Sequence, residues 1–171
     1  HYRHPTLAFL SANYDAIRWL PGSHALVFPA AGPALYLYPA SSPAPDWAIP
    51  YLESDGPLEI VMTGAGRELF RVYRLAAPPA LLALPAPTAP AQFGGLITLD
   101  AITTAPAASG ETLPVTLRWT VLAAPPMGTA LTTFVHLEDA AGHRWSQLEQ
   151  DAYPAEQWTP GEVILQRLDL P

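Results

Sequence analysis

The stretch "LPVTLRWTVL", residues 113–122, decides the fold class, because apolar side chains recur in it at every second position. The apolar positions are Val115, Leu117, Trp119 and Val121, and the polar ones between them are Thr116, Arg118 and Thr120. Successive side chains of a β-strand point to opposite faces, so this pattern is typical of a strand with one buried face. It predicts a half-buried strand within an antiparallel sheet.

Four other segments downstream of residue 93 also favour strands. They are "GLITLDAITT" (95–104), "ALTTFVHLED" (130–139), "HRWSQLEQD" (143–151) and "EVILQRLDL" (162–170). Short strands at this spacing, separated by Pro- and Gly-rich turns, indicate a β-sandwich. We therefore predict an antiparallel sandwich of immunoglobulin-like or jelly-roll type over residues 93–171.

Upstream, the pattern mixes helix and strand signals. "SANYDAIRWLPG" (11–22) predicts a short helix that Pro21 and Gly22 end. "HALVFPA" (24–30), "PLEIVMTG" (57–64) and "ELFRVYRL" (68–75) favour strands, whereas "PALYLYP" (33–39) fits a strand or a helical turn. Residues 1–77 are thus predicted to form a small α/β domain, which makes the whole chain α+β.

A proline-rich segment separates the two predicted domains. Five prolines fall within residues 78–90, with Pro78 and Pro90 at its ends. Proline fixes φ and lacks an amide donor, so an extended, semi-rigid linker is expected over residues 78–92.

Composition excludes several functional classes. The net charge is −7 and all eight basic residues are arginines, so neither nucleic acid nor an anionic lipid surface is an expected partner. The absence of cysteine excludes disulfides, thiolate nucleophiles and thiolate-bound metals. No apolar run approaches the roughly 20 residues of a membrane span. We expect a soluble fragment of a longer chain, because it starts at His1 without a methionine or a signal peptide.

Residues 132–147 bring four metal-ligand types close together, namely His136, Glu138, Asp139 and His143. On a strand, His136 and Glu138 share one face, whereas Asp139 and Gly142 bracket a tight turn. Catalytic zinc needs three protein ligands, and the sequence offers no third ligand with a reason to be near. We predict a β-hairpin with a polar face and no metal.

Other motifs for catalysis or cofactor binding are incomplete. "TGAGREL" (63–69) precedes a β-forming segment and not the helix that a phosphate site requires, so it predicts a hairpin turn. No serine lies in a G-x-S-x-G motif, and the carboxylate pairs Asp46 with Glu53 and Glu149 with Asp151 are expected on the solvated surface. We predict no catalytic residues and no cofactor.

Three aromatic residues, Trp145, Tyr153 and Trp158, are the candidate ligand-binding side chains. Flat exposed rings on a β-sandwich can stack on sugar rings, so the candidate ligand is a glycan. The alternative is that Trp158 packs under its own loop, with Pro160 and Gly161 forming a turn into the last strand.

The elements "LRW", "FVHLED", "YP" and W-x-PGE-V within residues 93–171 resemble the C-terminal β-sandwich module of bacterial family 39 glycosyltransferases, or mannosyltransferase-like membrane proteins. The span from "YDAIRWLPG" to "LFRVYRL" is similar, less specifically, to the small α/β region of these proteins. The resemblance implies a non-catalytic, extracytoplasmic accessory region of a membrane-embedded enzyme, with a glycan or a lipid-linked sugar acceptor as its candidate partner. A stand-alone carbohydrate-binding or adhesive module is the alternative.

Overall fold

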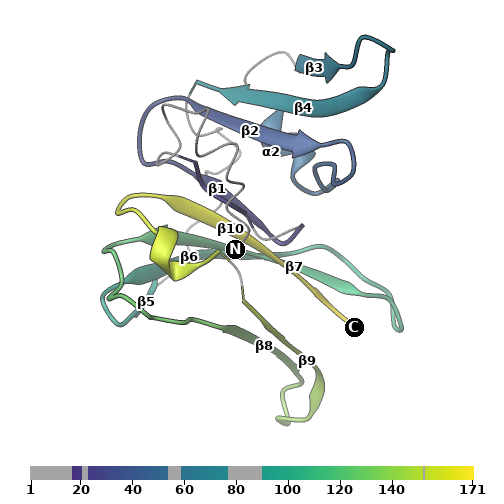
Figure 1. The fold of residues 1–171 in the computed structure, drawn as a ribbon. Coiled ribbons are helices and arrows are strands. Elements are labelled where there is room, and N and C mark those ends of the chain that lie inside the picture. The colour runs from purple at the N-terminus through teal and green to yellow at the C-terminus, as the bar shows by residue number, and fades with distance from the viewer. Residues whose placement is uncertain (1–16, 21–22, 54–58, 77–89, 152) are drawn as a thin grey trace.

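The described part of the chain folds into three antiparallel β-sheets, as Figure 1 shows. The computed structural model describes residues 17–20, 23–53, 59–76, 90–151 and 153–171. Within these residues the strands predominate, and the helices are single turns at Ile49–Leu52 (α2) and Ala155–Gln157 (η3). The described residues are thus mainly antiparallel β-structure, which is consistent with the predicted β-sandwich, whereas the predicted α/β part of an α+β fold is not confirmed.

The central sheet has five strands in the order β1-β10-β7-β6-β5. Their bounds are Ala25–Phe28 for β1, Val163–Leu170 for β10, Leu113–Val121 for β7, Ile97–Thr104 for β6 and Ala91–Phe93 for β5. The alternating segment that predicted a half-buried strand is β7, and it lies between β10 and β6. Its apolar positions Val115, Leu117 and Val121 are buried, as predicted.

A second sheet of three strands lies over one face of the central sheet, above it in Figure 1. Its order is β2 (Ala34–Pro39), β4 (Glu68–Leu75) and β3 (Glu59–Met62). The segment at residues 33–39, for which the sequence left two options, thus forms a strand. The Tyr36 hydroxyl donates to the Val27 carbonyl over 2.8 Å and links the second sheet to β1. Burial raises the pKa of this hydroxyl well above its ordinary value.

The third sheet is the hairpin of β8 (Thr133–Glu138) and β9 (Arg144–Gln150), which lies on the opposite side of the central sheet (Figure 1). Its inner side chains Val135 and Leu148 pack against the buried cluster that contains Leu117 and Leu168. Because side chains alternate along a strand, the neighbours of Val135 on β8 and of Leu148 on β9 point outward to solvent.

Strand β10 contributes to the cores on both sides of the central sheet. Leu165 belongs to the cluster under the three-stranded sheet, whereas Ile164 and Leu168 belong to clusters on the opposite face. Gln166 is buried on this opposite face, where its Oε1 accepts hydrogen bonds from Trp119 Nε1 at 3.2 Å and Thr133 Oγ at 2.9 Å. The second bond holds the start of β8 against the central sheet.

The central sheet joins the two halves of the chain. Strand β1, from the predicted first domain, pairs antiparallel with β10 near the other end of the sequence, with Leu26 opposite Leu165. The predicted helix at residues 11–22 and the predicted linker at 78–92 lie largely outside the described residues, so the α/β domain and the domain boundary stay predictions. One buried cluster, which contains Leu26 and Leu165, draws on both parts of the chain.

Candidate functional site

The exposed end of the β8–β9 hairpin holds the strongest candidate site, and its turn is built around Asp139. The carboxylate Oδ1 accepts from the amides of Ala141 and His143, each at 2.9 Å, and the Gly142 amide donates to the Asp139 carbonyl at 3.0 Å. Gly142 has a φ of 81°, a conformation that glycine adopts without steric cost. The predicted roles of Asp139 and Gly142 in the turn are confirmed.

These hydrogen bonds also fix the charge state of the turn. The His143 amide, followed by the other donors at the turn, lowers the pKa of Asp139 below its usual range. Asp139 is therefore ionised at neutral pH and accepts hydrogen bonds through both carboxylate oxygens.

Trp145 lies beside this turn, with 68% of its surface exposed. Its indole Nε1 donates to Asp139 Oδ2 at 3.3 Å, and its ring meets the His143 ring edge to face, with centroids 4.8 Å apart. Large apolar side chains fully open to water carry an unfavourable hydration cost unless something covers them. Here two contacts hold such a ring in place while most of its surface remains accessible.

Polar side chains surround Trp145 on the same hairpin. Arg144 donates from Nε to Glu138 Oε1 at 3.2 Å and from NH1 to Gln147 Oε1 at 3.0 Å. His136 Nδ1 lies 3.8 Å from the same Glu138 oxygen. The groups available to a ligand are therefore an imidazole, an amide and a paired carboxylate, which suit hydrogen bonding to hydroxyl groups.

The metal-ligand side chains at this turn are engaged in other contacts. Among the residues that the structure describes, no three or more histidine, aspartate or glutamate side chains are placed to hold a metal ion. Glu138 already pairs with Arg144, and Asp139 is occupied by the turn amides. The cluster is a network that orders a hairpin, as the turn chemistry predicted.

Tyr153 and Trp158 do not share the surface on which Trp145 lies. Tyr153 is 4% exposed and belongs to the core cluster formed by β1, β6, β7 and β10, and Trp158 packs against that cluster. The Tyr153 hydroxyl donates to the Gln157 carbonyl at 3.0 Å, and Trp158 Nε1 donates to the Tyr153 carbonyl at 3.1 Å. Trp158 thus lies under its own loop, which is the alternative that the sequence left open. Of the three predicted aromatic residues, Trp145 alone has an open ring.

A partly buried polar cluster next to this loop was not predicted from the sequence. Gln157 accepts from the Trp19 amide at 2.9 Å and donates to the Trp19 carbonyl at 3.3 Å. Glu162 is buried, accepts from the Thr159 amide at 2.9 Å and lies 4.0 Å from Arg18 Nε. Burial raises the pKa of Glu162, which the Thr159 amide and Arg18 partly oppose. These contacts tie residues 18–19 to the loop, so their role is structural.

The "TGAGREL" segment is a hairpin turn, as predicted. The Gly66 amide donates to the Thr63 carbonyl at 2.9 Å and the Arg67 amide to Thr63 Oγ at 3.0 Å. Strand β4 follows where a phosphate site would need a helix. Arg71 is engaged by Glu68 at 2.8 Å.

One exposed aromatic residue on the hairpin was not among the residues predicted to bind a ligand. Phe134 is 63% exposed and lies on β8, two positions before His136. The alternation in "TFVHLE" carried the signal, because Val135 faces the core and its neighbours in sequence must face away.

No family model, curated protein or solved structure matches the chain. Among the described residues, no helix is both long and apolar enough to span a membrane.

Proposed function

We propose that this chain is a non-catalytic accessory region of a glycosyltransferase-like membrane protein and that it binds a glycan at Trp145. The first part rests on the motifs "LRW", "FVHLED", "YP" and W-x-PGE-V, and the second on the hairpin. A glycan on the parent enzyme's acceptor, including a lipid-linked sugar, is the partner that this setting favours. The location that goes with the proposal is the extracytoplasmic side of a membrane.

The single observation that carries glycan binding is the exposed ring of Trp145. Sugar rings present a face of C–H groups that packs on an aromatic ring, and a rim of hydroxyl groups that hydrogen-bond to amides, imidazoles and carboxylates. Trp145 supplies such a ring, fixed by Asp139 and His143, and Gln147 and His136 lie on the same face of the hairpin. A ring that is already ordered loses little conformational entropy when a ligand binds.

A finer fold assignment belongs to the same proposal. We assign residues 93–171 to an immunoglobulin-like or jelly-roll sandwich, preceded by a small α/β unit. The support is the packing of the β8–β9 hairpin face to face with β7 and β10 through Val135 and Leu148. Such sandwiches commonly present binding residues on an outer strand face or at the loop ends.

The ligand part of the proposal is tested by isothermal titration calorimetry with a panel of neutral oligosaccharides. We expect wild-type protein to bind at least one of them and Trp145→Ala to abolish that binding. Phe93→Ala is the matched control, because Phe93 is also an exposed aromatic residue but lies on β5 and should not affect affinity. Equal binding by Trp145→Ala and wild type would remove the hairpin from the proposal.

The parent protein is tested by determining the coding sequence that precedes the codon for His1. Repeated segments of about 20 apolar residues there would support a membrane enzyme. A signal peptide directly before His1 would instead support the stand-alone carbohydrate-binding or adhesive module.

A further inference from the structure

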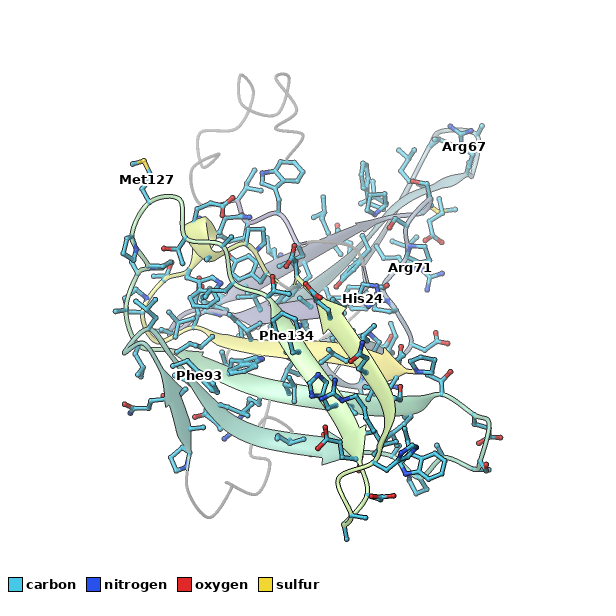
Figure 2. The ribbon with its side chains drawn as sticks, turned by 90° about the horizontal axis from the view of Figure 1, so that it is seen from below. His24, Arg67, Arg71, Phe93, Met127 and Phe134 are labelled. Atoms are coloured by element: carbon cyan, nitrogen blue, oxygen red, sulfur yellow. The ribbon has the colours of Figure 1, made fainter. Side chains whose placement is uncertain are left out.

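The outward face of the β8–β9 hairpin carries an exposed aromatic residue near each end. Phe134 lies at the start of β8, and Trp145 lies beside the turn at the other end. Figure 2 views the molecule from the side of this hairpin and labels Phe134 on it. Val135 and Leu148 point the opposite way, into the core, so the pleat places Phe134 on the solvent side.

The register fixes what lies between the two rings. Phe134 is opposite Glu149, and His136 is opposite Gln147. Leu137 is opposite Ser146, so Trp145 lies about level with Glu138, four residues along β8 from Phe134. At about 3.4 Å per residue, the two aromatic positions are about 14 Å apart along the hairpin. A single sugar ring cannot contact both, whereas a short oligosaccharide can.

The polarity of this face distinguishes a glycan from other occupants. A protein or lipid partner would favour a continuous apolar surface, but the centre of this face is His136 and Gln147. These side chains offer donors and acceptors to hydroxyl groups at positions where the strand pleat directs them outward. Aromatic rings at the ends with hydrogen-bonding groups between them match a chain of sugars lying along the strands.

The charge around the face selects the class of sugar. Four carboxylates lie on or beside it: Glu138, Asp139, Glu149 and Asp151. Arg144 is the arginine on this hairpin, and it is engaged by Glu138 and Gln147. A polyanionic glycan would meet net negative charge here, so repulsion disfavours it.

We propose that the outward face of the β8–β9 hairpin is an extended binding platform for a neutral, linear oligosaccharide, with Trp145 and Phe134 contacting different sugar units. This inference rests on the proposed glycan function and adds the second contact, the minimum length and the neutral class of the ligand.

The test measures affinities for a length series. Titrations would use cellobiose, mannobiose and maltose together with the corresponding hexasaccharides, and hexagalacturonate as the acidic probe. For the neutral hexasaccharide that binds, we expect Phe134→Ala to lower the affinity about tenfold, the effect of removing one buried apolar contact. For the matching disaccharide, which cannot reach both rings, Phe134→Ala should have no effect. Hexagalacturonate should bind at least tenfold more weakly than the neutral hexasaccharide.

Each outcome separates this inference from the proposed function. If Trp145→Ala abolishes binding while Phe134→Ala leaves the hexasaccharide affinity unchanged, the hairpin binds glycan but the extended platform is wrong. If hexagalacturonate binds as tightly as the neutral ligand, the neutral class is wrong. If no neutral oligosaccharide binds wild-type protein, the proposed function itself fails. Phe134 is on the surface, so circular dichroism of Phe134→Ala should match the wild-type spectrum.

Discussion

Substitution of Gly161 by alanine tests whether β1 lies alongside β10 in the central sheet. Gly161 has a φ of 86°, and a Cβ added to it would lie 2.7 Å from the Cβ of Ala30. Ala30 follows β1 and Gly161 precedes β10, so this contact exists only if the first and last described strands pair. Gly142, in the β8–β9 turn, has a similar φ of 81° with nothing within 4 Å of the added Cβ. The two glycines therefore differ in the steric contact and not in the backbone conformation.

The expected magnitudes follow from this difference. Placing an L-residue in the left-handed region costs about 1–2 kcal/mol, which both substitutions incur. The contact of 2.7 Å adds an overpacking cost of about 1–3 kcal/mol to Gly161→Ala alone. In a domain of this size each kcal/mol lowers Tm by about 2–4 °C, so Gly161→Ala should lower Tm clearly more than Gly142→Ala does.

The assay is thermal unfolding, followed by circular dichroism, for both single variants, Ala30→Gly and the double variant Ala30→Gly/Gly161→Ala. Removing the Ala30 methyl group should relieve the contact, so the cost of Gly161→Ala in the Ala30→Gly background should fall to that of Gly142→Ala. If Gly161→Ala costs the same in both backgrounds, Ala30 does not lie against Gly161, and the shared sheet would be refuted.

Three further predictions concern the core, the loop and the hairpin. Leu165→Ala removes a fully buried side chain from the cluster under the three-stranded sheet. It should lower the free energy of unfolding, measured by urea denaturation, by about 2–5 kcal/mol. A loss below about 1 kcal/mol would contradict the burial of Leu165. Burial raises the pKa of Glu162, so the contribution of Glu162 to stability should fall as pH rises through the interval between its unfolded and its raised folded pKa. The Tm of wild type minus that of Glu162→Gln, measured against pH, should therefore decrease across this interval, and a constant difference would contradict the raised pKa. The pKa of Asp139 is lowered, so Asp139 should stay ionised as pH falls through the usual carboxyl range. The NMR signal of the Trp145 indole proton, which is donated to Asp139, should therefore stay constant across that range and shift only at lower pH. The variant Asp139→Asn should shift this signal at every pH.

The strands were largely predictable because period-2 alternation is a local property of the sequence. Residues 113–122 and the neighbouring segments each predicted a strand, and each forms one. The partners of the strands were not predictable in the same way, since alternation identifies the buried face but not the strand that lies alongside. The pairing of β1 with β10 joins residues more than a hundred positions apart, and no local signal encodes it.

In the candidate site, the turn was predictable from the sequence, but the exposure of the aromatic side chains was not. Turn chemistry located Asp139 and Gly142, because their conformational preferences act within a few residues. The exposure of Trp145 and the burial of Tyr153 depend on which layer covers each segment, which is a tertiary property. Phe134 could have been found from its alternation with Val135, once the inner face of the hairpin was known.

The loop that carries the W-x-PGE-V resemblance has a structural explanation. The Thr159 amide donates to the Glu162 carboxylate, the Glu162 amide donates to the Thr159 carbonyl, and the Gly161 amide donates to the Val121 carbonyl at the end of β7. These residues therefore build the turn into β10 and connect it to the end of β7. A protein that shares this motif can be expected to share the turn, since the turn requires those residue types. In the proposed function the ligand contacts come from the exposed hairpin face with Trp145, where substitutions can change binding without disturbing the core.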